Sequence, residues 1–256
     1  MGTMVSIDIR DPHVAQPAVA AVTAWLHHVD DTFSTYKPDS PISAIGRGDS
    51  DITTWTDEIR EVLRLCETVR RETGGAFSAF DVPAPNGTRL DPSGLVKGWS
   101  IERAAAILES YGVANFCINA GGDIALRGCP SEGSAWRVGI RHPNDSHAVA
   151  AVIHGSGQLA VATSATYSRG AHIIDPRTKE PAMGLASATI AGPDLTLADA
   201  YATAVFVMGL DGLEWIEEHP AYDAYLITHD GTACWSPGFA RYRDSSRVGS
   251  GVVVAT

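Results

Sequence analysis

The order of helical and strand-like patterns along the chain constrains its fold more than any other sequence feature. A short alternating strand at 4–9 precedes helical apolar spacing over 17–33, 56–73 and 97–111. Strand-like segments follow at 115–128, 136–140, 148–153, 159–169, 172–178 and 186–192. A helix over 196–206, a short helix at 211–219 and a hairpin at 224–235 come next. Because helices and hairpins are intermixed, the sequence favours an α+β fold over a doubly wound parallel sheet.

Length and composition are typical of a single globular domain. The 256 residues predict a single domain over 1–256, or two intimately joined lobes, with 45% hydrophobic residues. A net charge of −11 argues against nucleic acid and against an anionic membrane surface as partners. No run approaches the roughly 20 apolar residues of a membrane span, and charged residues interrupt the start of the chain. We therefore expect a cytoplasmic protein for the chain as it stands, or an exported one if a leader was removed.

Asp199 is the most unusual residue of the chain, because it lies in a helix that is otherwise Ala, Tyr, Val and Phe. A buried, unpaired carboxylate is costly, so proteins pair it, neutralise it or give it a metal. Thr203 lies four residues on, so its hydroxyl shares a helical face with the carboxylate. The alternative is a first-turn acid that only favours the helix dipole.

Two further segments carry polar groups at positions suited to chemistry. LDPSGLVKGWSIERAAAIL at 90–108 ends a loop and begins a helix near Lys97, which predicts an anion site or, alternatively, a plain helix entrance. His172 precedes two β-branched residues and an Asp-Pro turn, so its imidazole is expected at a strand end. A histidine there suits a general base at neutral pH, although a structural histidine is the simpler alternative. NAGGD at 119–123 and GGAFS at 74–78 are each as well explained by turns.

Taken in order, these segments resemble the ApbE-type flavin transferases, the FAD:protein FMN transferases. The resemblance extends from Met1 to about Gly209, and no single motif is specific by itself. The matching segments are MGT at 1–3, FSTYKPDSPIS at 33–43, GGAFS at 74–78, LDPSGLVKGWSIERA at 90–104, NAGGD at 119–123, VATSATYSR at 161–169, HIIDPRT at 172–178 and ADAYATA at 198–204.

The resemblance implies an ApbE-like α/β roll with mixed, largely antiparallel sheets and packed helices. It also implies a Mg²⁺-dependent enzyme that cleaves FAD, transfers FMN to a threonine hydroxyl of an acceptor protein and releases AMP. The family's metal ligands match Asp199, Thr203 and the backbone carbonyl of Val96, and its base matches His172. Positions that contact the flavin or the rest of FAD in the family match Met1, Tyr36, Ala76, Phe77, Ser78, Ser93, Trp99 and Ile173.

The chain also departs from the family pattern. Ser78 stands where many members have Asp, with Asp81 close behind it. Ala165 and Lys179 each replace a common Gly, and the stretch between TYSR and HIID is short. Two other functions are therefore considered beside transfer: a Mg²⁺-dependent FAD pyrophosphatase that passes FMN to water, and a flavin-binding protein without turnover. A passive flavin-binding protein has no use for a metal site and a base together.

Overall fold

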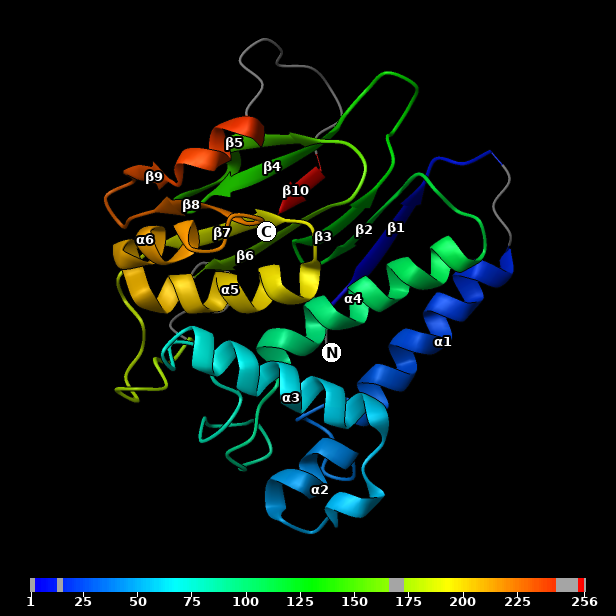
Figure 1. Ribbon diagram of the computed structural model, residues 1–256, viewed down its shortest axis with the longest axis vertical. Helices are drawn as coiled ribbons and strands as arrows, with labels where there is room; N and C mark the ends of the chain where they lie inside the picture. Colours follow the sequence, from blue (N-terminus) through cyan, green and yellow to red (C-terminus); the bar gives the residue numbers. More distant parts are fainter. Residues whose placement is uncertain (1–2, 13–15, 166–172, 243–252, 256) are drawn as a thin grey trace.

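A largely antiparallel sheet forms the centre of the molecule (Figure 1). The structure is a computed structural model that describes residues 3–12, 16–165, 173–242 and 253–255. Within these residues seven strands pair in the order β1-β2-β3-β6-β7-β8-β9, and every neighbouring pair is antiparallel. The strands are β1 (Val5–Ile9), β2 (Phe116–Ala120), β3 (Asp123–Arg127), β6 (Leu159–Ala165), β7 (Ser187–Gly192), β8 (Asp223–Ile227) and β9 (Ala233–Trp235).

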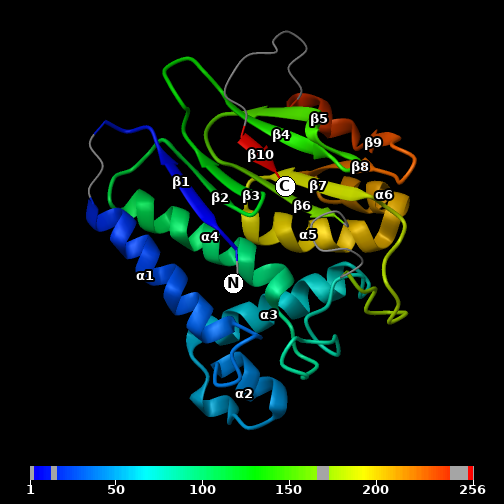
Figure 2. The same ribbon diagram turned by 180° about the vertical axis from the view of Figure 1, so that it is seen from behind.

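A smaller sheet covers one face of the large sheet, and helices cover the other (Figures 1 and 2). The smaller sheet has the order β10-β4-β5. Strand β4 pairs with β10 in parallel and with β5 in antiparallel orientation. Its strands are β4 (Trp136–His142), β5 (Asp145–Gly155) and β10 (Val253–Ala255). The helices are α1 (Gln16–Phe33), α2 (Pro41–Arg47), α3 (Asp57–Glu72), α4 (Ser93–Ser110), α5 (Leu195–Met208) and α6 (Gly212–Glu217).

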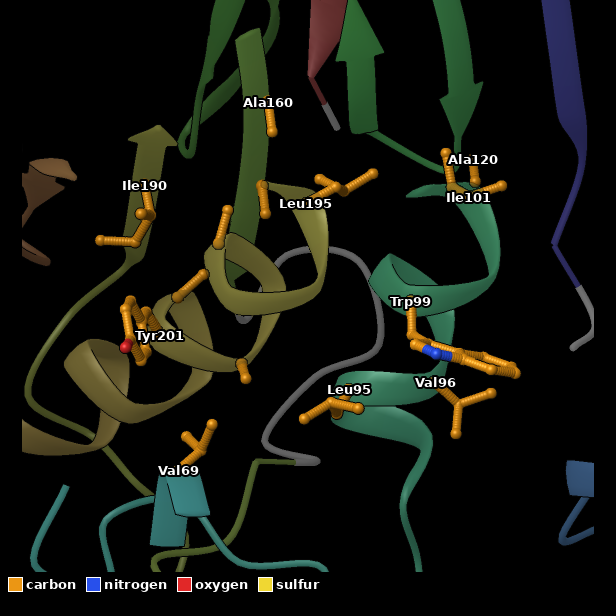
Figure 3. Packing of buried hydrophobic residues seen from close by; sticks show 14 of the residues in the cluster. Val69, Leu95, Val96, Trp99, Ile101, Ala120, Ala160, Ile190, Leu195 and Tyr201 are labelled. Atoms are coloured by element: carbon orange, nitrogen blue, oxygen red, sulfur yellow. The ribbon is translucent and has the colours of Figure 1, made fainter. Parts of the chain in front are cut away.

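Strand alternation divides the buried side chains between two cores. In β2, Phe116, Ile118 and Ala120 face the helices, whereas Cys117 faces the smaller sheet. Small residues such as Ala160 lie beneath α5, so this helix packs closely on the sheet (Figure 3). Because α5 lies between the sheet and helices α3 and α4, buried residues occur all around it. This location explains the almost uninterrupted apolar sequence around Asp199.

The α+β prediction is confirmed, and most predicted elements are present at nearly the expected residues. The apolar spacing over 56–73 is confirmed by α3, which is capped by the Thr56 side chain and buries Ile59, Val62, Leu63, Cys66 and Val69. Described helices include none that is long and apolar enough to cross a membrane.

Two predictions about local structure were wrong. Helix α4 begins at Ser93, a turn earlier than expected, because Leu95 and Val96 pack the added turn into the core. The described part of 172–178 is not a strand: Ile174 forms a single bridge with Pro181. Strand β10, which pairs with β4, and helix α2 were also not predicted.

Helices α4 and α5 cross at Gly98, where the two backbones meet closely. A Cβ atom on Gly98 would lie 2.3 Å from the Leu195 carbonyl oxygen and 2.8 Å from the Asp199 Cβ. The Gly98 N–H donates to Asp199 Oδ2 over 2.9 Å. One glycine thus sets the separation of the two helices and the position of the Asp199 carboxylate.

We predict that Gly98→Ala destabilises the protein by about 1–3 kcal/mol, because a backbone carbonyl cannot move aside as a flexible side chain can. Gly94→Ala is the matched control in the same helix, where the added Cβ lies 3.3 Å from the Phe77 ring. Both changes gain similar helix propensity, so their difference in urea-denaturation free energy isolates the close contact. Equal stability of the two variants would contradict this account of the crossing.

Candidate functional site

A cavity of about 620 Å³ opens where the first turn of α4 meets α5, β6 and the segments at 34–36, 76–91 and 173–176. Its size is typical of sites for drug-sized and cofactor-sized ligands. Apolar and hydroxyl side chains dominate the lining, and Lys97 is the only described lining residue with a cationic side chain. The lining includes Thr3, Tyr36, Ala76, Phe77, Ser78, Ser93, Val96, Lys97, Thr163, Ser164, Ala165, Ile173, Asp199 and Thr203.

Asp199 lies in the second turn of α5 and is only 4% exposed. The first-turn role is filled by Asp194, the N-cap residue, whose side chain accepts a hydrogen bond from Leu197 N. The interpretation of Asp199 as a residue that only favours the helix dipole is therefore wrong. Its carboxylate is instead held at the α4–α5 crossing and lines the cavity.

A second buried carboxylate, Asp123, lies close to Asp199. Asp123 begins β3 directly after the Gly121-Gly122 turn, and its Oδ1 accepts from Thr163 N over 3.2 Å. Lys97 Nζ forms an ion pair with Asp123 Oδ2 and lies 3.6 Å from Asp199 Oδ1. The sequence placed Asp123 in the NAGGD motif but gave it no role; the only signal was a charged residue directly after a turn at the start of an apolar strand.

The residues predicted to bind Mg²⁺ all line the same cavity. Thr203 Oγ1 lies 3.3 Å from Ser164 Oγ, so two hydroxyls accompany the Asp199 carboxylate. Val96 lies within α4, where a carbonyl normally accepts one backbone N–H and keeps a second lone pair. Among the described residues no cluster of three His, Cys, Asp or Glu side chains could cage a metal. One carboxylate with hydroxyl and carbonyl oxygens fits Mg²⁺, which keeps waters and substrate phosphates as its other ligands.

Most of the predicted FAD-contacting residues that the structure describes also meet at this cavity. Ala76 and Phe77 are buried in its wall, and Ile173 lies at the start of the described segment after residue 172. Ser93 lies in the first turn of α4, and Ser78 folds over the Phe80 backbone through two hydrogen bonds. Tyr36 remains 72% exposed, so its ring is available to a ligand at the rim.

Trp99 does not lie with this group. Its ring is buried against Phe33 and Trp25, and its indole N–H donates to Glu61. The reason is helix geometry, because Trp99 lies about 200° around α4 from Lys97 and so points away from the cavity. The predicted contact between Trp99 and FAD is not supported by this position. Met1 and His172 lie outside the described residues.

One departure from the family pattern, Lys179, contacts Asp81, the acid that follows another departure, Ser78. Lys179 adopts φ +67°, a conformation that favours glycine, at the position where many family members have Gly. Its Nζ donates to both the carboxylate and the backbone carbonyl of Asp81, and Arg89 also pairs with that carboxylate. These two cations lower the pKa of Asp81 to about 2. Ala165, the third departure, lines the cavity at the end of β6.

Burial dominates the electrostatics of Asp199. It raises the pKa of this carboxyl from its ordinary value of 3.8 to about 8; Lys97 opposes the shift and Asp123 adds to it. A folded-state pKa above the unfolded value means that the folded protein binds this proton more tightly between about pH 4 and pH 8. The contribution of Asp199 to stability therefore falls as the pH rises through that window.

We predict that Asp199→Asn stabilises the metal-free protein at pH 8 by about 1–3 kcal/mol relative to the parent, because the amide carries no buried charge. The advantage should shrink as the pH falls to 5, where the parent is protonated too. Urea denaturation in EDTA across this range measures both curves. A pH-independent difference between the two proteins would contradict the assigned shift.

Comparisons with known proteins agree with this geometry. The sequence profile of the ApbE family matches residues 1–84 and 78–226. The FAD:protein FMN transferase of Vibrio cholerae is 35% identical over 168 residues, 61% of this chain and 48% of that protein. The FAD:protein FMN transferase of Rhodobacter capsulatus is 30% identical over 239 residues, 89% of this chain and 42% of that protein. The chain thus spans about half the length, or less, of these curated relatives.

Solved structures show the same fold. The flavin transferase ApbE from Vibrio cholerae aligns with a TM-score of 0.83 and 25% identity, over 94% of this chain and 96% of that one. The ApbE protein from Thermotoga maritima aligns with a TM-score of 0.84 and 23% identity, over 95% and 97%. The profile match includes the α4 and α5 segments that form the cavity, and with most of the sequence matched, this chain belongs to the ApbE family.

Proposed function

We propose that this chain is a Mg²⁺-dependent FAD:protein FMN transferase, which moves FMN from FAD to a threonine hydroxyl of an acceptor protein and releases AMP. One observation carries the proposal: a single cavity brings Asp199 and Thr203 to Lys97, beside the residues that match the family's FAD contacts. Relatives that bear the name FAD:protein FMN transferase support it further.

The lining suits a ligand with an aromatic part and a phosphate part. Phe77 and Tyr36 offer ring surfaces, and hydroxyls at Ser93, Thr163 and Ser164 offer hydrogen bonds. The first turn of α4 and the Lys97 ammonium provide positive potential, which favours phosphate oxygens.

Asp199, Thr203 and the Val96 carbonyl would hold Mg²⁺ at the end of the cavity where they lie together. When bound, Mg²⁺ supplies positive charge to the pyrophosphate oxygens. Phosphoryl transfer depends mainly on such neutralisation and on positioning, so no covalent intermediate with the protein is needed.

The reaction exchanges one phosphorus–oxygen bond for another. The threonine Oγ bonds to the FMN phosphorus, the bond from that phosphorus to the bridging oxygen breaks, and AMP leaves with that oxygen. His172, which lies outside the described residues, is proposed as the base that accepts the threonine proton. Its chain neighbour Ile173 lines the cavity.

The direct test incubates the protein with FAD, Mg²⁺ and a peptide that carries the acceptor threonine, followed by mass spectrometry of peptide and nucleotides. We expect a peptide heavier by one FMN moiety together with stoichiometric AMP. Release of FMN and AMP with an unlabelled peptide would establish the pyrophosphatase instead. Bound, uncleaved FAD would identify a flavin-binding protein without turnover.

We predict that His172→Ala lowers the rate of FMN transfer by about 10²–10⁴-fold, the usual effect of losing a general base. Binding of FAD, followed by quenching of flavin fluorescence, should be retained because the imidazole is given no part in it. Transfer by the parent should slow as the pH falls below the pKa of a histidine, because an imidazolium cannot accept the proton. Full transfer activity of the variant would remove His172 from the mechanism.

We predict that Asp199→Ala abolishes transfer and the response to Mg²⁺, because Thr203 and one carbonyl cannot hold the ion without a carboxylate. Circular dichroism provides the control for folding. Leu197→Ala, in the same helix but outside the cavity lining, is the matched substitution and should retain transfer. A Mg²⁺ titration curve of Asp199→Ala that matches the parent would exclude Asp199 as a ligand.

A further inference from the structure

Lys97 lies between two buried carboxylates that come from different elements of the fold. Asp123 on β3 is 1% exposed and Asp199 on α5 is 4% exposed, whereas the Lys97 side chain reaches between them from α4. We propose that Asp123 is a positioning residue that holds the Lys97 ammonium to one side of Asp199, so that Asp199 Oδ1 stays open to a divalent cation. This proposal concerns the same site as the proposed function. It depends on that function in one respect only, which is that Asp199 binds a divalent cation.

The two carboxylates share Lys97 unequally. Asp123 Oδ2 forms an ion pair with Lys97 Nζ and has no other hydrogen-bond partner among the described residues. Asp199 Oδ2 already accepts the Gly98 N–H, and Asp199 Oδ1 lies 3.6 Å from Lys97 Nζ, beyond hydrogen-bonding distance. The ammonium therefore lies closer to the Asp123 carboxylate than to the Asp199 carboxylate.

The backbone of Asp123 is fixed well enough to hold the lysine in this way. Asp123 pairs with Ala120 across the β2–β3 turn, and its Oδ1 accepts from Thr163 N on the neighbouring strand β6. Gly121 within the turn has φ +61°, and a Cβ atom added there would lie 2.4 Å from Thr3 Oγ1, so the turn is closely packed. The lysine side chain is the flexible partner, and the strand carboxylate sets where its ammonium lies.

Charge counting gives the consequence of losing Asp123. Once Asp199 has lost its proton, two carboxylates and one ammonium leave a net charge of −1, which attracts a divalent cation to Asp199. Without the Asp123 charge the net charge of these groups is zero, and Asp199 is the other described carboxylate that lies within ion-pair distance of Lys97. An ammonium drawn onto Asp199 Oδ1 would compete with the cation for the same oxygen. Removal of Lys97 as well restores both the net charge of −1 and the open oxygen.

The test measures Mn²⁺ binding to the metal-free protein without FAD, from the loss of the free Mn²⁺ signal in electron paramagnetic resonance. Asp123→Asn should weaken Mn²⁺ binding at least tenfold. The double variant Asp123→Asn/Lys97→Met should bind within about threefold of the parent. Lys97→Met alone should bind at least as tightly as the parent. Circular dichroism of each variant provides the control for folding, because removing both members of a buried ion pair can also restore lost stability.

Asp223→Asn is the matched control. Asp223 is equally buried at the start of β8, is paired with Arg241 and Ser236, and lies outside the cavity lining. The Asp223→Asn variant should be less stable than the parent but should bind Mn²⁺ with the same affinity.

Three results would overturn the proposal. One is that Asp123→Asn binds Mn²⁺ as tightly as the parent. Another is that Asp123→Asn binds Mn²⁺ more weakly and the double variant Asp123→Asn/Lys97→Met does not regain the parent's affinity. The third is Mn²⁺ binding by the parent that Asp199→Ala leaves unchanged. If Asp123→Asn does not fold, weaker Mn²⁺ binding by Lys97→Met overturns the proposal by itself. These readouts do not involve FMN transfer, so an unlabelled peptide would count against the proposed function and leave this inference standing.

Discussion

The close crossing of helices α4 and α5 at Gly98 is the constraint on which the site depends. Because Gly98 has no side chain, its backbone reaches the Leu195 carbonyl and donates its N–H to the Asp199 carboxylate. The same contact places Lys97, the preceding residue, against that carboxylate. The crossing thus aligns a carboxylate, an ammonium and the first turn of α4 on one cavity. A wider crossing would leave the core packed but would separate these groups.

The site is costly for the fold that carries it. Asp199 lies in an apolar helix between the sheet and two other helices, where burial raises its pKa and only part of its charge is met by Lys97 and Gly98. The presence of such a carboxylate is better explained by a cation that binds to it than by a contribution to folding stability. Proteins that have no use for a buried carboxylate replace it or pair it fully. The Ala-rich packing around α5 supplies the stability that this charge reduces.

Much of the fold could be predicted because its local signals agree with the final packing. The Thr56 cap and the apolar stripe of α3, the Gly-Gly turn between β2 and β3, and the Asp230-Gly231 hairpin are all specified within a few residues. The start of α4 was placed a turn late, since the loop-like sequence before Lys97 is helical only in its packed setting. The pairing of β10 with β4 joins residues more than 100 positions apart and has no local signal.

The sequence by itself determined which residue types the site would hold. Asp199 and Thr203, four residues apart on one helix, were identifiable because helical periodicity fixes which residues share a face. Only the tertiary structure decided that Trp99 points away from the cavity and that Asp123 meets Lys97 and Asp199. The reason is physical: these relations depend on how far apart α4, α5 and β3 lie and on how each is rotated. Those quantities follow from contacts such as Gly98 against Leu195, between residues almost a hundred positions apart, which no local pattern encodes.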